Sequence, residues 1–163
     1  MAALNLDRIY SDIDIMADTT VQRKVEKWIR EEFLPKKLGQ HFQEAKVPLI
    51  WGGSFNFDAV SDDGKIVANI STSKARMANK KAGIGKLNKI IADTFYLLNA
   101  RGVERLILVF TEPDMRDEFV RRREIGRFPP EVELLLVDDS PIGLRHELEA
   151  SRKVASMEVE PRH

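Results

Sequence analysis

Hydrophobic residues recur every three to four positions over Val21–Phe33, and this spacing predicts an amphipathic helix. Thr19-Thr20 precede the segment and are suited to cap its first turn, and Pro35 is expected to end it. A longer segment with the same spacing runs from about Ile84 to Asn99 and predicts a second helix. The positions expected on its buried face are Ile84, Leu87, Ile90, Ile91, Thr94, Phe95 and Leu98.

Between these two helices the pattern changes to the alternation that is typical of β-strands. Over 47–60 the chain reads VPLIWGGSFNFDAV, and Gly52-Gly53 divides it into two predicted strands joined by a bend or bulge. KIVANISTS, at 65–73, follows the turn residues SDDG and predicts a third strand that forms a hairpin with the second. The hydrophobic runs RLILVF at 105–110 and VELLLV at 132–137 are typical of strands covered on both faces.

Two further helices are expected at about 113–126 and about 141–156. The order is then helix, three-strand meander, helix, strand, helix, strand, helix, which predicts an α/β protein with a mixed central sheet flanked by helices. The length of 163 residues fits a single domain, 1–163. Within it we expect a core at about 20–110 and an additional helix-strand-helix part at about 113–156.

The predicted hairpin brings polar residues together. If Asp63-Gly64 forms a two-residue turn, Asp58 lies directly opposite Asn69. Cross-strand partners share one face of a sheet, and the polar residues expected on this face are Asp58, Asn69, Ser71 and Ser73. A three-residue loop with a bulge would instead shift the register by one residue and separate them.

This element order, together with FDAV at 57–60 and IVANISTSK at 66–74, resembles the PD-(D/E)XK nuclease superfamily, which has the restriction-endonuclease-like fold. The resemblance covers about residues 20–110. It implies that a first Asp and an acidic residue on the next strand hold magnesium, which polarises the scissile phosphate and activates a water. It also implies a lysine, two positions after the second acid, that positions this water. Asp58 matches the first position and is the expected metal ligand.

The second half of the family motif is absent. Its slot falls on Asn69–Ser71, or on Ser71–Ser73 if the hairpin is read two residues later, and neither segment contains a carboxylate or a lysine. Amide and hydroxyl oxygens do not supply the charge of a carboxylate, so magnesium is expected to bind weakly.

Residues elsewhere are expected to replace the missing groups. Lys74 or Lys86 would supply the cation, and Glu32 or Glu26 of the first helix would supply the second carboxylate. Glu32 lies in the middle of the hydrophobic arc of that helix. The sequence therefore predicts a magnesium-dependent nuclease with an altered or inactive site, or a non-catalytic nucleic-acid-binding or assembly module on the same fold.

Charge is distributed unevenly along the chain. The 26 basic and 26 acidic residues cancel, so affinity for DNA or RNA must come from a local patch. Residues 64–92 contain no acid, and their basic side chains predict contacts with nucleic-acid phosphates, the alternative being a solvated lysine-rich loop. The expected nucleic-acid-binding residues of this segment are Arg76, Lys80, Lys81, Lys86 and Lys89.

Composition excludes several kinds of site. The chain has no cysteine, which removes disulfides, thiolate zinc sites and a cysteine nucleophile, and its 3 histidines are scattered. No hydrophobic run approaches the ~18 residues that span a bilayer, and Asp7 and Arg8 interrupt the start, so a cytoplasmic protein without membrane partners is expected. Trp51 is expected in the core. The sequence leaves a homo-oligomer open.

Overall fold

The computed structural model describes residues 19–76 and 83–158, the last four of these as backbone only. The chain divides into two compact units. The larger unit, Trp28–Asp139, contains the sheet. The smaller unit combines Met1–Lys27 with Ser140–His163.

The larger unit is built on a five-stranded sheet in the order β1-β2-β3-β4-β5. β1, β2 and β3 pair antiparallel, whereas β4 and β5 continue the sheet in parallel pairing. The strands are β1 (Phe42–Pro48), β2 (Ser54–Ser61), β3 (Ile66–Ser71), β4 (Arg105–Phe110) and β5 (Val132–Leu136). The helices of this unit are η1 (Ile29–Phe33), α2 (Leu34–Leu38), α3 (Ile84–Leu98) and α4 (Pro113–Glu124).

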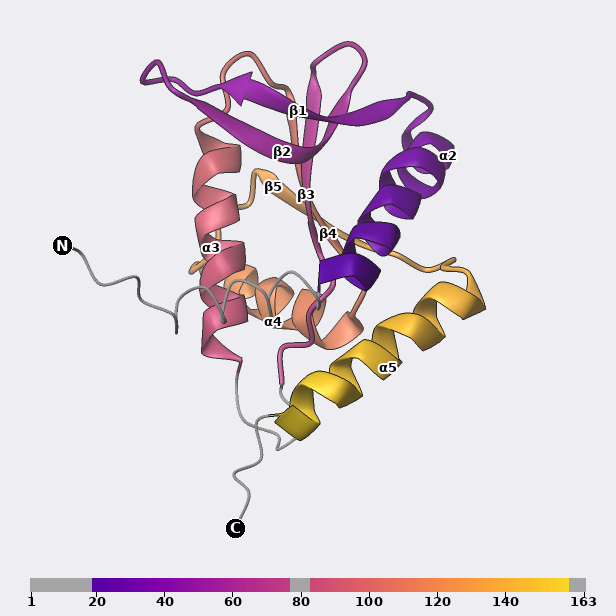
Figure 1. Ribbon diagram of the computed structural model, residues 1–163. Coiled ribbons are helices and arrows are strands. Elements are labelled where there is room, and N and C mark those ends of the chain that lie inside the picture. The colour runs from indigo at the N-terminus through magenta and orange to yellow at the C-terminus, as the bar shows by residue number, and fades with distance from the viewer. Residues whose placement is uncertain (1–18, 77–82, 159–163) are drawn as a thin grey trace, which may run out of the picture. The chain divides into compact units, whose positions relative to one another are not determined.

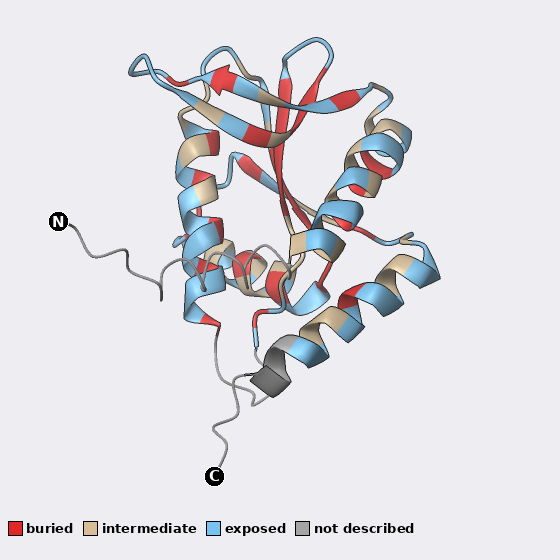
Figure 2. Cartoon of the chain, viewed as in Figure 1, coloured by how far each residue is buried: buried red, intermediate tan, exposed pale blue. Residues whose placement is uncertain are grey.

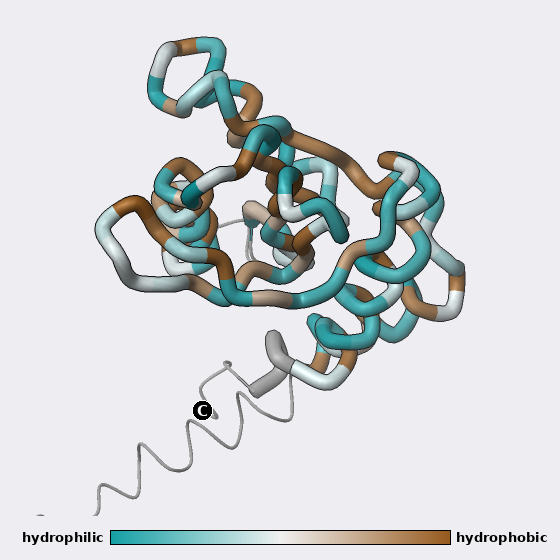
Figure 3. Tube along the Cα trace, turned by 90° about the horizontal axis from the view of Figure 1, so that it is seen from above, coloured by the Kyte–Doolittle hydropathy of each residue, from teal (hydrophilic) through white to brown (hydrophobic). Residues whose placement is uncertain are grey.

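Helices cover both faces of this sheet, and α2 and α3 stand on opposite sides of it (Figure 1). The central strands β3 and β4 are accordingly buried along most of their length (Figure 2). Hydrophobic residues recur at short intervals along the coloured part of the trace instead of forming one block (Figure 3). The predicted α/β class with a mixed sheet flanked by helices is thus confirmed.

The β2–β3 hairpin has the predicted register, with Ala59 opposite Ala68 and Val60 opposite Val67. The turn itself lies one residue earlier than expected, because the Gly64 N–H donates to the Ser61 carbonyl at 2.9 Å. Gly64 adopts a φ of 70°, which a residue without Cβ tolerates best. The predicted two-residue turn is therefore wrong, although the register that it was meant to set is right.

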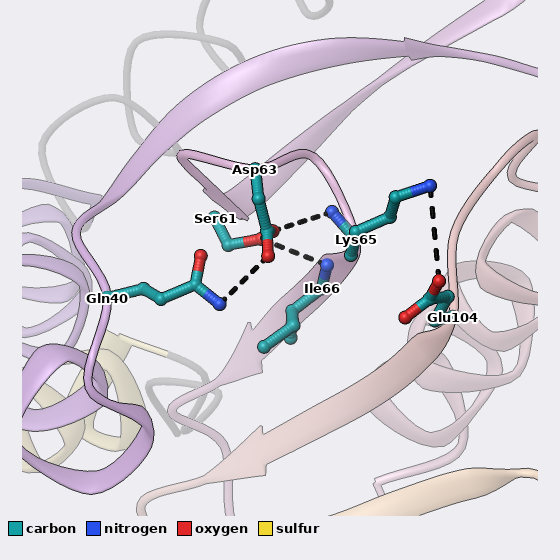
Figure 4. A network of polar contacts seen from close by, with 6 residues as sticks. All are labelled: Gln40, Ser61, Asp63, Lys65, Ile66 and Glu104. Carbon is teal, nitrogen blue, oxygen red and sulfur yellow. Dashed lines mark hydrogen bonds and ion pairs between the residues drawn. The ribbon is translucent and has the colours of Figure 1, made fainter.

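Side chains complete this turn (Figure 4). One Asp63 carboxylate oxygen, Oδ1, accepts hydrogen bonds from the Ser61 hydroxyl at 2.6 Å and from the Lys65 N–H at 2.9 Å. The Ser61 hydroxyl oxygen in turn accepts from the Ile66 N–H at 3.0 Å. The side-chain oxygens thus accept from the Lys65 and Ile66 N–H groups, which in a two-residue turn would pair with backbone carbonyls of the opposite strand.

The first predicted helix continues past Pro35, so the expectation that proline ends it is wrong. Residues 19–28 are α-helical, and a π turn, η1, follows in which the Leu34 N–H donates to the Ile29 carbonyl. Pro35 then stands in the first turn of α2, where the N–H that proline lacks is not required. Gly39, with a φ of 72°, ends the helix.

The strand boundaries also differ from the predicted ones. β1 begins at Phe42, whereas the sequence pattern predicts a strand only from Val47. β3 ends at Ser71, which leaves Ser73 outside the strand and outside the expected polar face. In the smaller unit, α5 (Ile142–Glu158) matches the last predicted helix and buries Leu148.

The buried face of α3 was predicted correctly at Leu87, Ile90 and Thr94 and incorrectly at the other positions. The sheet side of the helix holds Leu87, Ile90, Thr94 and Leu97. Four residues expected there are exposed instead: Ile84, Ile91, Phe95 and Leu98. Trp51, also expected in the core, is 54% exposed and stacks on the Phe95 ring at 5.5 Å. In the described part of the chain, no helix is long and hydrophobic enough to cross a membrane.

Candidate functional site

Asp58 and Asn69 meet across the β2–β3 hairpin, as the register predicts. The Asp58 N–H donates to the Asn69 side-chain oxygen at 3.3 Å, and the Ile70 N–H donates to the Asp58 carboxylate at 2.8 Å. Next to the Ala59–Ala68 pair, hydrogen bonds to the side chains of Asp58 and Asn69 thus replace the backbone hydrogen bonds between the two strands. The Asp58 carboxylate is thereby held at a point where the two strands separate.

The position of this pair in the sheet directs it toward α3. Val60 and Val67 face each other and belong to the core that also includes Leu87 of α3. Asn69, two residues after Val67 on β3, shares that face. Asp58 lies where β2 is irregular, between Phe57 opposite Ala45 and Val60 opposite Gln43, and its hydrogen bonds with Asn69 and Ile70 place it beside Asn69.

Helix α3 places a second carboxylate and a cation near Asp58. The Lys89 ammonium lies 3.8 Å from the Asp93 carboxylate, and Asp93 retains only 16% of its side-chain exposure while Lys89 retains 69%. Asp93 follows Lys89 by four residues, so both side chains project from the same side of the helix. Each of these two groups also interacts electrostatically with Asp58.

Burial controls the protonation of both carboxyls. Burial raises the pKa of Asp58, whereas the hydrogen bond from the Ile70 N–H and the charge of Lys89 lower this pKa. The pKa of Asp93 rises to about 6, mainly because of burial; the charge of Lys89 opposes this rise and the charge of Asp58 adds to it. Both carboxyls are therefore protonated more readily than an exposed aspartate.

Two backbone and charge contacts complete the surroundings of Asp58. The Arg30 guanidinium donates to the Asp58 carbonyl at 2.8 Å, which ties η1 to β2. Glu44 on β1 adds a further negative charge that raises the Asp58 pKa. No sequence pattern singled out Arg30 or Glu44, because their proximity arises from strand and helix packing.

The remaining residues of the expected β3 slot are spread out. Asn69 is 2% exposed, and its Nδ2 has no hydrogen-bond partner among the described residues. Ser71 is half-buried at the end of β3, where its hydroxyl accepts from the Ser73 N–H at 3.5 Å. Lys74 is exposed beyond the strand. The structure therefore brings Asn69, but not Lys74, against Asp58.

The two expected helix carboxylates belong to different compact units. Glu32 is exposed on η1, so its predicted position within a buried arc is wrong. Glu26 belongs to the smaller unit, while Asp58 belongs to the larger. The second carboxylate that the structure does supply is Asp93. No sequence pattern predicts it, because Asp93 comes directly after the acid-free segment 64–92.

The predicted nucleic-acid-binding residues have different surroundings. Lys86 and Lys89 are exposed on α3. Arg76 is exposed, and its backbone N–H donates to the Asp114 carboxylate at 3.4 Å, which fixes the segment after β3 to the start of α4. Lys80 and Lys81 lie outside the described residues.

Asp58 and Asp93 fall short of a complete metal centre by themselves. Within residues 19–76 and 83–158, no group of three or more histidine or acidic side chains is arranged to hold a metal ion. Two carboxylates and the neighbouring Asn69 amide nevertheless present the oxygen donors that magnesium prefers.

Comparison of the chain with family models, with curated proteins and with solved structures finds no match. The fold and the geometry of Asp58, Asn69, Lys89 and Asp93 therefore carry the functional argument. They define an α/β protein with a partly buried acidic pair on one face of a mixed sheet.

Proposed function

We propose that this chain acts on nucleic acid as a magnesium-dependent phosphodiesterase with an altered site, in which Asp58 and Asp93 hold the cation. The observation that carries this proposal is the approach of an α3 carboxylate and its lysine to the hairpin aspartate. The resemblance to the PD-(D/E)XK nucleases supports it, because Asp58 stands at the first position of their motif.

The chemistry of these side chains fits the proposal. Two partly buried carboxylates that repel each other are neutralised best by a divalent cation. Bound magnesium would supply a Lewis acid for the phosphate. The Lys89 ammonium, exposed beside Asp93, is suited to bind a phosphate oxygen.

Asn69 limits the affinity of the proposed site for magnesium. It occupies the hairpin position where the motif has an acidic residue, and its neutral amide contributes no charge to cation binding. We therefore expect weak magnesium binding and slow cleavage, with manganese as the better cofactor.

A non-catalytic nucleic-acid-binding or assembly module is the second candidate, and the hydrogen bond from the Ile70 N–H to Asp58 favours it. This bond gives the carboxylate a structural use in closing the hairpin. In that case the protein binds nucleic acid equally well with and without divalent cations.

Calorimetric titration with magnesium and manganese, together with cleavage of labelled DNA and RNA, tests the proposal. Asp58→Asn and Asp93→Asn should each weaken cation binding at least tenfold and abolish cleavage. Asp117→Asn, which alters an exposed carboxylate on α4, should leave both unchanged. Absence of cation binding by the unaltered protein, or equal binding by all variants, would exclude the metal-dependent function.

A gain of binding gives a second, independent test. Asn69→Asp keeps the size of the side chain and adds a third carboxylate to the pair, so it should tighten magnesium binding several-fold. The matched control is Gln43→Glu, which adds a carboxylate at an exposed position on β1. Unchanged affinity in Asn69→Asp would mean that the cation does not bind between β2 and α3.

A further inference from the structure

Two aromatic side chains are exposed at the C-terminal end of α3, where the β1–β2 turn meets the helix (Figure 1). The Trp51 indole stacks on the Phe95 ring, with an angle of 27° between the two planes. Both residues, which we call the aromatic pair, are nevertheless more than half exposed, at 54% and 52%. Neither the core nor the acidic pair accounts for this exposure, so the outer surface of the stack is accessible to a ligand.

Backbone hydrogen bonds hold Trp51 in place. The Ile50 N–H donates to the Asn99 carbonyl at 3.0 Å, which fixes the β1–β2 turn to the end of α3. Within the turn, the Leu49 N–H donates to the Gly53 carbonyl at 2.7 Å. The turn is therefore already ordered, which lowers the entropic cost of stacking a ligand on the indole.

A series of ring contacts connects the aromatic pair to the core. Phe95 lies edge-on to Tyr96 at 5.5 Å, and Tyr96 stacks on Phe55 at 4.1 Å. Phe55 in turn packs against the fully buried Phe57 at 4.9 Å. These rings belong to α3 and β2, so the two elements that carry the acidic pair also support the aromatic pair.

The surroundings of the aromatic pair are basic. Segments 46–57 and 94–103 contain no acidic residue and two basic ones, Lys46 and Arg101. Both basic side chains are exposed, and neither forms an ion pair with another described residue. The Arg101 N–H donates to the Pro48 carbonyl at 2.8 Å, which places Arg101 beside the strand that leads into the turn. A ligand that packs on the aromatic pair is therefore expected to carry negative charge.

An unpaired nucleotide combines the two properties that these residues select. Its base offers a flat aromatic face, and its phosphate carries a negative charge. In a duplex the faces of the bases are covered by neighbouring bases, whereas in a single strand they are free to stack on an aromatic side chain. The aromatic pair and its basic surroundings thus favour a single strand over a duplex, and over a hydrophobic protein partner, which would gain nothing from unpaired basic residues.

The aromatic pair lies close to the acidic pair along α3. Phe95 follows Lys89 by six residues, which corresponds to about 9 Å along the helix axis at roughly 1.5 Å per residue. Lys89, beside Asp93, is the lysine suited to bind a phosphate oxygen. A single strand that stacks a base on Trp51 can therefore place its backbone, a few nucleotides away, at Lys89.

We propose that the aromatic pair binds an unpaired base, and that the substrate of the acidic pair is single-stranded nucleic acid. This inference rests on the proposed function for its class of substrate, whereas stacking on Trp51 itself requires no metal ion.

Fluorescence anisotropy with a labelled oligodeoxythymidylate, in the presence of a chelator, tests this proposal without cleavage. The unaltered chain should bind the single strand at least tenfold more tightly than a duplex of the same length. Trp51→Leu should weaken single-strand binding at least fivefold, because a base loses its aromatic partner. Trp51→Phe keeps a ring and should retain most of the affinity.

Ile50→Ala is the matched control, because Ile50 is a neighbouring hydrophobic residue with 63% exposure. This variant should bind the single strand as tightly as the unaltered chain. Equal losses in Trp51→Leu and Ile50→Ala would indicate a hydrophobic contact without base stacking and would overturn the proposal, as would equal affinity for the single strand and the duplex.

Tryptophan fluorescence gives a second readout that leaves Trp51 unaltered. The chain has 2 tryptophans, so Trp28→Phe makes Trp51 the single reporter. The single strand should quench the emission of this variant, and the duplex should not. Emission that the single strand leaves unchanged would contradict stacking on Trp51.

The same measurements separate this proposal from the metal-dependent function. Quenching of Trp51 in chelator by a chain that binds no divalent cation would support the single-strand site and exclude the phosphodiesterase. Metal-dependent cleavage by a chain that shows neither quenching nor preference for the single strand would retain the phosphodiesterase and exclude the role of the aromatic pair.

Discussion

The acidic pair illustrates how a single residue acquires its chemistry from its position. Asp93 is exposed over only 16% of its side chain, and Asp58 lies close enough to raise its pKa further. The positive charge of Lys89 lowers the pKa of Asp93, but Lys89 is itself 69% exposed, so solvent screens its charge. Asp93 is thus a largely buried carboxylate whose negative charge is only partly balanced by Lys89. Carboxylates of this kind are more typical of binding sites than of structural ion pairs.

The protonation of Asp93 leads to a prediction about stability and pH. Its pKa rises from 3.8 to about 6 in the folded chain, so the folded state binds this proton more tightly than the unfolded state. The free energy of unfolding should therefore fall as pH rises from about 4 to about 6. Asp93→Asn should remove this decrease and stabilise the chain at pH 7 by on the order of 2 to 3 kcal/mol.

Urea denaturation at several pH values, in the presence of a chelator, measures this effect. The control is Asp117→Asn, whose curve should parallel that of the unaltered chain. If Asp93→Asn is less stable than the unaltered chain at pH 7, then the Asp93 carboxylate is compensated by its surroundings and does not form a strained acidic pair.

The β2–β3 turn is the element that sets the site, because its register brings Asp58 opposite Asn69. Hydrogen bonds from Ser61 and Lys65 to the Asp63 carboxylate lower the pKa of that carboxyl. Asp63 therefore contributes stability that is present above its ordinary pKa of 3.8 and is lost as pH falls below that value. Asp63→Ala should lower the melting temperature at pH 7 but change it little near pH 2.

Thermal denaturation at the two pH values provides the comparison. Asp62→Ala alters the neighbouring exposed aspartate, which makes none of the side-chain bonds drawn in Figure 4, and it should have the smaller effect at pH 7. A loss of stability in Asp63→Ala that is as large at pH 2 as at pH 7 would show that the ionised carboxylate does not hold the turn.

Local patterns predicted the elements better than they predicted which faces are buried. The alternating pattern placed the hairpin and its register correctly, because strand pairing in a hairpin depends on neighbours in sequence, although the turn lies one residue earlier than predicted. The burial of α3 depends on the sheet that packs against it, and a helix with two hydrophobic arcs does not reveal which arc faces inward. Pro35 misled for a related reason, because the π turn before it removes the need for its missing N–H.

The candidate site was predictable to a similar extent. Asp58 and Asn69 followed from hairpin pairing, which is a short-range relation. Asp93 came from a helix that begins over twenty residues after Asp58, and only the packing of α3 on the sheet brings the two carboxyls together. Long-range proximity of this kind leaves no periodic signal in a single sequence.

For the molecule as a whole, basic and acidic residues cancel, so the position of the basic residues determines where nucleic acid would bind. The formal net charge is +0, so no overall field draws nucleic acid toward the chain. Lys89 stands on α3 beside the acidic pair and Lys86 is exposed on the same helix, three residues earlier, which would direct a phosphate backbone to that part of the larger unit. By contrast, Arg121 and Arg122 on α4 are paired with Glu118 at 2.8 and 3.1 Å, which leaves them less available for phosphates.

Nucleic-acid binding should therefore weaken steeply as salt increases, with a slope that reports the number of phosphates contacted. The double variant Lys86→Glu with Lys89→Glu should reduce affinity at low salt at least tenfold and lower the logarithmic slope by roughly 2, about 0.9 for each lost contact. Fluorescence anisotropy with labelled DNA and RNA at several salt concentrations measures both quantities. The matched control is Arg121→Glu with Arg123→Glu, which makes the same change in total charge on α4. If the two double variants lose affinity equally, binding follows net charge alone, and the basic residues of α3 do not form a local nucleic-acid site.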